Sequence, residues 1–426
     1  MSRLVAVGRR VAAPVQVLRR PLGRIAAFGI LPAVSLLSNL VVLPILSARF
    51  GEAGWSSVLL GQSIGAAVSV VCALAWPIEG PHLASVATPV QRFAMYRTSL
   101  RQRGLAVALA TPVMVAVCLL ADPPMPLVCS LSAVAIALNA LSPSWYFVGA
   151  SQPSRSLVAE GGPRLAVNLL AIGLVALFPL WTYPAVLIAG MAATLVIAAV
   201  SVRRDLRSSG VHHGTGEAPP RPMGGRAQVF AIVARGADAG YSYLTGPLVV
   251  FVAPAAYPLY AAVDRLAQSL VNVMSTVAQG LTAWIGEGRG DRRRRVLGAV
   301  ALAVVIAVTA LGVLFLAAPL LLRYLFAGTV TSGPLVAFLA AAITTGAFLT
   351  RSLSLILLVP QGMAPVAYRI MLAAACVGLP LVGVGATVWG SLGALVVVAT
   401  LPWATVAVQL VVGLRCGSSG TTASAD

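Results

Sequence analysis

Several charged side chains lie inside long apolar stretches of the sequence, where a charge is costly to keep. They are Arg235 with Asp238, Asp264 with Arg265, and Arg351. An ionised side chain at the centre of a bilayer costs about 2.5–3.5 kcal/mol on insertion scales, so it normally faces a cavity or a partner. A guanidinium keeps its charge and binds phosphate oxygens through two parallel hydrogen bonds. Arginines in such positions therefore indicate a site for an anionic group.

The spacing of these residues separates balanced charges from unbalanced ones. Arg235 and Asp238 are three residues apart and share a helix face, so they can either neutralise each other or face a ligand. Asp264 and Arg265 are adjacent and point about 100° apart around a helix. Arg351 has no acidic residue in its own apolar stretch, which makes it the best candidate for an uncompensated positive charge.

The residue types that are missing exclude other chemistries. The chain has no lysine, so it has neither a Walker A phosphate loop of its own nor a Schiff-base lysine. None of its five cysteines lies at metal-ligand spacing, and His212 and His213 lie in a polar loop without ligand partners. We therefore expect no metal site and no cofactor.

The elements that must position these side chains are membrane-spanning helices. Of 426 residues, 59% are hydrophobic and only 9% are charged, with a mean hydropathy of +0.94, whereas soluble proteins carry about 25% charged residues. A run of about twenty apolar residues spans the hydrocarbon core. Scanning on that length predicts twelve spans, over residues 25–47, 55–78, 104–121, 127–149, 164–181, 184–201, 228–251, 258–285, 296–321, 334–358, 367–384 and 388–413.

The arginines predict the topology. If the N-terminus is cytoplasmic, all but five of the 29 arginines fall in cytoplasmic segments. Only Arg49 and Arg323 fall on the outer side, and Arg235, Arg265 and Arg351 fall within spans. This bias obeys the positive-inside rule, supports an even number of spans and places both termini in the cytoplasm.

The segments between and around the spans predict the domain organisation. The 1–24 segment is basic and is expected either to lie as an amphipathic helix on anionic headgroups or to form a disordered tail. The remaining predicted units are a six-helix bundle over 25–201, a flexible cytoplasmic linker over 202–227, a second six-helix bundle over 228–413 and a cytoplasmic tail over 414–426.

The two predicted bundles look related. Residues 50–55 and 252–257 form small-residue turns at equivalent places, and the same offset in sequence sets Gln62 opposite Asp264. Internal repeats are a common way to build transporters. Two unrelated outer turns rich in small residues are the alternative.

Two stretches carry a resemblance to a known family. One combines the basic loop Gly288–Arg295, an apolar helix, the segment Ala318–Gly328 and then Gly333–Leu335; the other is the first hairpin, Leu43–Gly51. In their order and composition they resemble the polysaccharide flippases. These are the O-antigen and exopolysaccharide exporters of the multidrug/oligosaccharidyl-lipid/polysaccharide (MOP) superfamily.

The resemblance implies an all-α polytopic membrane protein, MATE-like, with two pseudo-symmetric six-helix bundles around a central cavity. It implies a transporter rather than an enzyme, which flips a polyprenyl-(pyro)phosphate-linked oligosaccharide across the plasma membrane by alternating access for cell-surface polysaccharide biosynthesis. Its partners would be membrane lipids, the lipid-linked oligosaccharide, and possible polysaccharide polymerase and glycosyltransferases, with no nucleic acid.

The resemblance also implies roles for the polar residues of the spans. The headgroup phosphate would contact Arg49, Arg235, Arg265 and Arg351; charge balance or ion coupling would fall to Asp238 and Asp264; and Asn39, Gln62 and Asn272 would be polar residues of the cavity.

Two other functions stay open at this stage. A multidrug or metabolite exporter of the same fold would need an acidic lumen, whereas the spans offer only Asp238 and Asp264, each close in sequence to an arginine. A membrane glycosyltransferase or polymerase would need catalytic groups at the outer face. The short predicted outer loops offer only Arg49, Glu52, Asp122 and Arg323.

Overall fold

The computed structural model describes residues 41–150, 152–208, 241–287, 292–358 and 363–419, and all regular structure in these ranges is helical. Eight helices of the described residues are long and apolar enough to cross a membrane. Two of these, Val41–Cys72 and Pro365–Gly413, each contain a turn, at Gly51 (φ +61°) and at Trp389–Gly390. α10 (Tyr257–Glu287) and the shorter apolar helix Tyr241–Val252 are further helices of the described residues, and most of the predicted spans 25–47 and 228–251 lies outside them.

The first half of the chain contributes six spans. After the helix Val41–Cys72, the short α2 (Trp76–Val86) leads to α3 (Pro89–Leu120). The fourth span is broken into α4 (Pro126–Ala137), the 3-10 turn η1 (Leu138–Leu141) and α5 (Ser144–Gly149). The fifth consists of α6 (Pro153–Ser156), the π-helical turn η2 (Leu157–Gly161) and α7 (Gly162–Leu177), and the sixth is α8 (Thr182–Ser208).

The second half has the same plan. The helix Tyr241–Val252 and the 3-10 turn η3 (Pro254–Ala256) lead into α10 (Tyr257–Glu287). They are followed by α11 (Arg292–Leu325), α12 (Pro334–Leu353) with the π-helical turn η4 (Ser354–Leu358), and α13 (Ala364–Ser419).

Local sequence explains where several of these helices begin. Thr88 forms a capping box with Gln91 at the start of α3, which satisfies two backbone N–H groups that a helix end leaves without partners. Prolines occupy the first turn of α2, α3, α4, α7 and α12, where the missing N–H costs nothing. The second span ends at Cys72 rather than near the predicted residue 78, because Leu74 adopts a positive φ and Pro77 starts α2.

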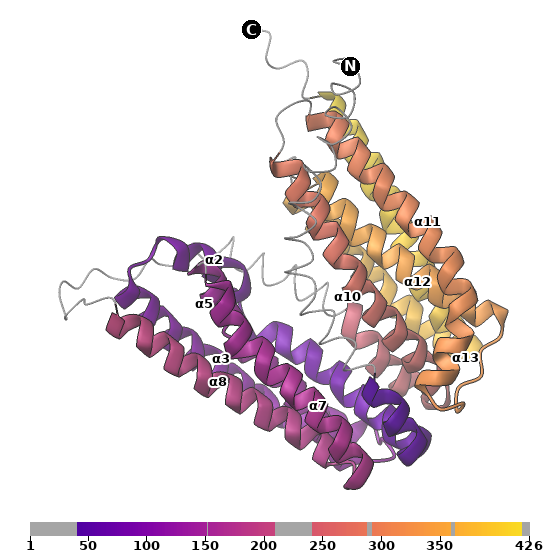
Figure 1. The fold of residues 1–426 in the computed structure, drawn as a ribbon. Coiled ribbons are helices and arrows are strands. Elements are labelled where there is room, and N and C mark those ends of the chain that lie inside the picture. Colours follow the sequence, from indigo (N-terminus) through magenta and orange to yellow (C-terminus); the bar gives the residue numbers. More distant parts are fainter. Residues whose placement is uncertain (1–40, 151, 209–240, 288–291, 359–362, 420–426) are drawn as a thin grey trace, which may run out of the picture.

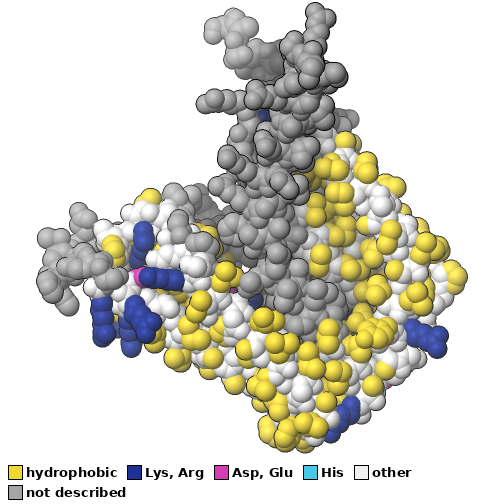
Figure 2. Space-filling model, viewed as in Figure 1, with side chains coloured by type: hydrophobic (Ala, Val, Ile, Leu, Met, Phe, Trp, Pro, Cys, Tyr) yellow, Lys and Arg dark blue, Asp and Glu magenta, His cyan; other side chains and the backbone are white. Residues whose placement is uncertain are grey.

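The two halves form two arms that meet at one end and separate at the other (Figure 1). At the meeting end, one hydrophobic cluster includes residues of both halves, and the rings of Trp55 and Phe326 lie 4.5 Å apart. At the separated end the clusters belong to one half each. We refer to these as the sealed end and the arginine-rich end, because the ends of α3, α8 and α11 that lie away from the seal carry most of the described arginines. Large apolar side chains cover the outward faces of both arms (Figure 2), as a lipid-facing surface requires.

Candidate functional site

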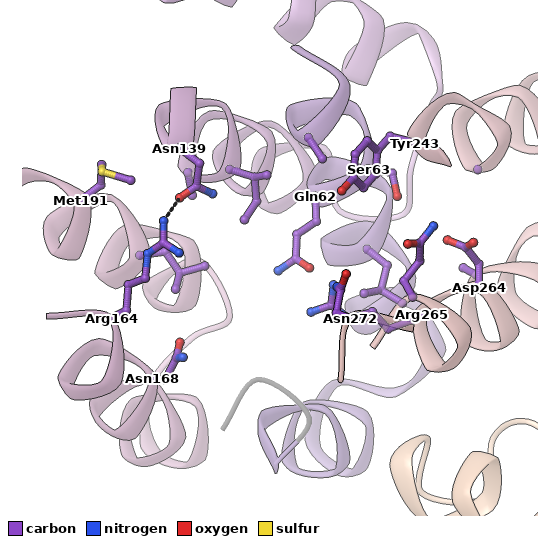
Figure 3. Close-up of a pocket in the computed structure, with 18 of the residues that line it drawn as sticks. Gln62, Ser63, Asn139, Arg164, Asn168, Met191, Tyr243, Asp264, Arg265 and Asn272 are labelled. Carbon is purple, nitrogen blue, oxygen red and sulfur yellow. Dashed lines mark hydrogen bonds between the residues drawn. The ribbon is translucent and has the colours of Figure 1, made fainter. Parts of the chain in front are cut away.

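A cavity of about 290 Å³ lies between the two halves. The first half lines it with the helix Val41–Cys72, α4, η1, α7 and α8, and the second half with Tyr241–Val252 and α10. Its polar wall contains Gln62, Ser63, Asn139, Arg164, Asn168, Thr194, Tyr243, Asp264, Arg265, Gln268 and Asn272 (Figure 3). The fold therefore collects polar side chains from both halves at membrane depth.

Most of the polar wall from the second half is one stripe of α10. Asp264, Gln268 and Asn272 are four residues apart and so lie on one helix face, with Arg265 beside them. Val263, Leu266 and Ala267, on another side of α10, are apolar and buried. Helical periodicity thus turns the polar side of α10 towards the cavity.

Gln62 provides the corresponding wall from the first half. Its side chain is only 7% exposed, and its Nε2 donates a hydrogen bond to the Tyr183 hydroxyl at 3.2 Å. Its Oε1 is buried and has no hydrogen-bond partner among the residues that the structure describes. The sequence offset that sets Gln62 opposite Asp264 corresponds to a shared place in the structure, because both residues line this cavity.

Arg265 is a partly exposed cation of the cavity wall. Its guanidinium forms no hydrogen bond or ion pair with any described residue, and its Nε is buried. Asp264, the preceding residue, interacts electrostatically with it, while Gln268 Nε2 donates to the Ser242 carbonyl at 3.3 Å. Only the Nε of Arg265 is buried, and the residue is partly exposed on the cavity wall, so its guanidinium is accessible to a ligand.

Arg351 lies next to the cavity rather than in its wall. It lines a smaller cavity of about 100 Å³ within the second half, and Asp264 and Gln268 line both cavities. Its Nη1 donates to Asn272 Oδ1 at 3.5 Å, and Asn272 faces the larger cavity. Arg351 therefore connects to the site through Asn272.

Arg49, expected to contact the headgroup phosphate, is not among the residues that line this cavity. It is at the sealed end, where its Nη1 and Nη2 donate to the carbonyls of Val175 and Leu177 at 2.8 and 3.3 Å. These carbonyls belong to the last turn of α7, which leaves its acceptors unpaired and carries partial negative charge. Its guanidinium also stacks over the Phe50 ring at 5.2 Å. Its contacts are those of a residue that closes a helix end.

Three predicted site residues, Arg235, Asp238 and Asn39, fall outside the described residues. Within the described ranges, no group of three or more histidine, cysteine or acidic side chains lies together as metal ligands would.

The sequence analysis missed Arg164 and its neighbours. Arg164 appears in it as a cytoplasmic residue, because it stands at the edge of a predicted span. The structure places it in the cavity wall, where its Nη2 contacts Glu160 Oε1 at 2.7 Å and donates to Asn139 Oδ1 at 3.3 Å (Figure 3). The i, i+4 spacing of Glu160 and Arg164 was the available signal, and it predicts a pair but not a cavity.

The comparisons with known proteins agree on the fold. No model of a protein family and no curated protein matches the chain. Solved structures do match. The chain is 14% identical to the inward-facing conformation of a multidrug resistance MATE family transporter of the MOP superfamily, over 92% of this chain and 96% of that one, with a TM-score of 0.52. The chain is also 14% identical to the outward-facing conformation of a multidrug resistance MATE family transporter of the MOP superfamily. This match covers 94% of this chain and 97% of that one, with a TM-score of 0.53.

A third similar structure is a MOP superfamily transporter from Pyrococcus furiosus, described as having a binding pocket of reverse polarity that suggests a different function. It is 15% identical, over 94% of this chain and 96% of that one, with a TM-score of 0.52. At these identities the likeness establishes the fold. The chain has the two-bundle fold of MOP superfamily transporters, as the sequence analysis expected.

Proposed function

We propose that the chain is a transporter that moves a polyprenyl-(pyro)phosphate-linked oligosaccharide across the plasma membrane by alternating access. In this proposal the arginine-rich end faces the cytoplasm, in line with the positive-inside rule. The single observation that carries the choice of substrate is Arg265, a guanidinium that forms no ion pair with a described residue and lines a cavity between the two halves.

The arrangement of the arms supports alternating access. The cavity lies between halves that share a hydrophobic core at the sealed end and have separate cores at the arginine-rich end. A site between two bundles becomes accessible to either side when one bundle rocks against the other. The described conformation is closed at the end that the proposal assigns to the outer side.

The chemistry of the wall supports an anionic, hydroxylated ligand. Arg164 and Arg265 both line the wall, where Glu160 pairs with Arg164 and Asp264 lies beside Arg265. The feature that suits an anion is therefore the guanidinium groups themselves, which bind phosphate oxygens through two parallel hydrogen bonds. The amides of Asn139 and Asn168 offer both donors and acceptors, which sugar hydroxyls require. A volume of about 290 Å³ is at the lower end for ligand sites, so it suits a headgroup rather than a whole glycolipid.

Export of a cationic drug is the second candidate, and one observation favours it. Asp264 forms no ion pair with any described residue, so its carboxylate is available to a cationic ligand. The two candidates differ in which charge of the α10 stripe binds the ligand.

Transport by the full chain reconstituted in liposomes tests the proposal. Arg265→Gln should reduce the flipping of a polyprenyl-pyrophosphate-linked oligosaccharide at least tenfold, since a hydrogen bond to a charged group contributes about 1.5–3 kcal/mol. Arg323→Gln, in an exposed arginine at the sealed end, is the control and should leave flipping unchanged.

A different result would favour the second candidate. If Arg265→Gln flips the lipid as the unaltered chain does, while Asp264→Asn abolishes efflux of a cationic dye, the proposed substrate is wrong and drug export is supported.

A further inference from the structure

The Glu160–Arg164 pair is held on the cavity wall by a connected set of hydrogen bonds. Glu160 Oε1 receives both Arg164 Nη2, at 2.7 Å, and the Ser142 hydroxyl, at 2.7 Å. Arg164 Nη2 also donates to Asn139 Oδ1 at 3.3 Å. The carboxylate therefore has two donors, and only one of them is the arginine.

The Glu160 side chain is held in place by its neighbours in the first half, whereas the Arg164 side chain, in the same half, is more exposed. The Ser142 carbonyl accepts from the buried Arg103 at 2.9 Å, and the Ser142 hydroxyl accepts from the backbone N–H of Ser144 at 3.3 Å. Glu160 itself lies in the π-helical turn η2, and its side chain is 12% exposed. The Arg164 side chain is 44% exposed and lines the cavity. Loss of the ion pair would therefore leave Glu160 in place and release Arg164.

From this arrangement we propose that Glu160 acts as an internal anion, which occupies Arg164 while the cavity is empty and yields it to a phosphate of the substrate. The inference rests on the proposed function, and it adds Arg164 as a second phosphate contact and Glu160 as a residue that determines specificity.

The relative strength of the two partnerships supports an exchange. Ion pairs with an exposed member contribute little, since their attraction is screened by solvent and offset by side-chain ordering. A phosphate can accept two parallel hydrogen bonds from the same guanidinium and carries more charge than a carboxylate. A phosphate can therefore displace Glu160, whereas a ligand with a single weakly charged group gains nothing by the exchange.

A second arginine lines the same cavity from the other half. Arg164 belongs to the first half and Arg265 to the second, and both line the cavity (Figure 3). A pyrophosphate that contacts both guanidinium groups connects the two halves. A monophosphate that takes only one of them leaves the halves unlinked.

Binding of farnesyl pyrophosphate to the purified full chain in detergent tests the inference, with farnesol as the uncharged reference. Glu160→Gln keeps an acceptor for Ser142 but removes the competing charge, so it should tighten binding up to about fivefold, the equilibrium value of an exposed ion pair. Arg164→Gln should weaken binding about tenfold or more, as expected for a lost hydrogen bond to a charged group. The double variant should bind as Arg164→Gln does.

Arg155→Gln is the matched control. Arg155 belongs to the same span, its side chain is 45% exposed, and it is ion-paired with Asp205, but it does not line the cavity. Its replacement should leave binding of farnesyl pyrophosphate unchanged. If Glu160→Gln does not fold, the Arg164→Gln and Arg155→Gln variants still decide whether Arg164 contacts the ligand.

The failures of the inference and of the proposed function can be told apart. If Arg265→Gln weakens binding while Glu160→Gln and Arg164→Gln bind as the unaltered chain does, the inference is wrong and the proposed site stands. If farnesyl pyrophosphate binds no better than farnesol, neither the proposed phosphate site nor its regulation by Glu160 is correct.

Discussion

Among single residues, the buried arginine of α3 shows how strongly the fold can change the meaning of a sequence position. Arg103 is 1% exposed, and its Nη1 donates to the carbonyls of Ala140 and Ser142 at 2.8 and 2.9 Å. These carbonyls lie at the break between η1 and α5, where the helix no longer supplies donors. From sequence, Arg103 looks like one more cytoplasmic arginine, because nothing in its spacing indicates which carbonyls it will meet.

Replacement of this arginine should destabilise the protein. Arg103→Leu leaves two buried carbonyls without donors, so we expect the free energy of unfolding to fall by about 2–4 kcal/mol. Unfolding in mixed detergent and SDS micelles measures it. Arg101→Leu is the control, because Arg101 is exposed and its loss should change stability by less than about 0.5 kcal/mol. Equal effects of the two substitutions would contradict a specific role for Arg103.

At the scale of helices, close packing depends on two glycines of the second span. A Cβ on Gly61 or Gly65 would lie 2.1 Å from the carbonyl oxygen of Cys129 or 2.2 Å from that of Ala133. Small residues allow membrane helices to approach this closely, and here they seat the helix Val41–Cys72 against α4. Both helices contribute to the cavity wall, so their spacing also sets the position of Gln62.

Alanine should lower stability at these closely packed glycines and should not lower it at a glycine that has no close neighbour. Gly65→Ala forces the two backbones apart and should cost about 1–3 kcal/mol. Gly104→Ala in α3 meets nothing within 4 Å and should be neutral or stabilising by up to about 1 kcal/mol, because alanine favours a helix. Thermal unfolding of the two variants in detergent gives the comparison. A stable Gly65→Ala protein would show that the helices do not need this contact.

The spans were predictable and the breaks within them were not. Apolar length alone gives the number and order of the helices, since the bilayer fixes that length. The turns η1, η2 and η4 leave no comparable signal, because their hydrogen bonds depend on residues distant in sequence, such as Arg103. The same reason explains the site. Arg265 and Gln62 can be found because they are polar within spans, whereas Arg164 is held on the wall by Asn139 and Glu160, which lie in the separate breaks η1 and η2.

For the molecule as a whole, the arrangement of the arms predicts access from one side. A Ser63→Cys variant without the native cysteines places a thiol in the cavity wall. A maleimide that cannot cross membranes should label it in inverted vesicles, where the proposed cytoplasmic side is outside, and much less in whole cells. Cysteine at Thr329, a surface position in the loop at the sealed end, should show the reverse pattern. Labelling of Ser63→Cys only from the cell exterior would contradict the assigned orientation.

The arginines on both arms at the arginine-rich end should make the separation of the arms depend on salt and lipid charge. The rim of the first half carries the exposed Arg97, Arg101, Arg203 and Arg204, and the rim of the second half carries Arg294 and Arg295. Bringing these rims together opposes like charges, and that repulsion weakens as the Debye length shrinks to about 8 Å at physiological ionic strength. Dissolved salt and anionic lipid should therefore favour the state in which the rims meet. The apolar contact of Trp55 with Phe326 at the sealed end responds to neither.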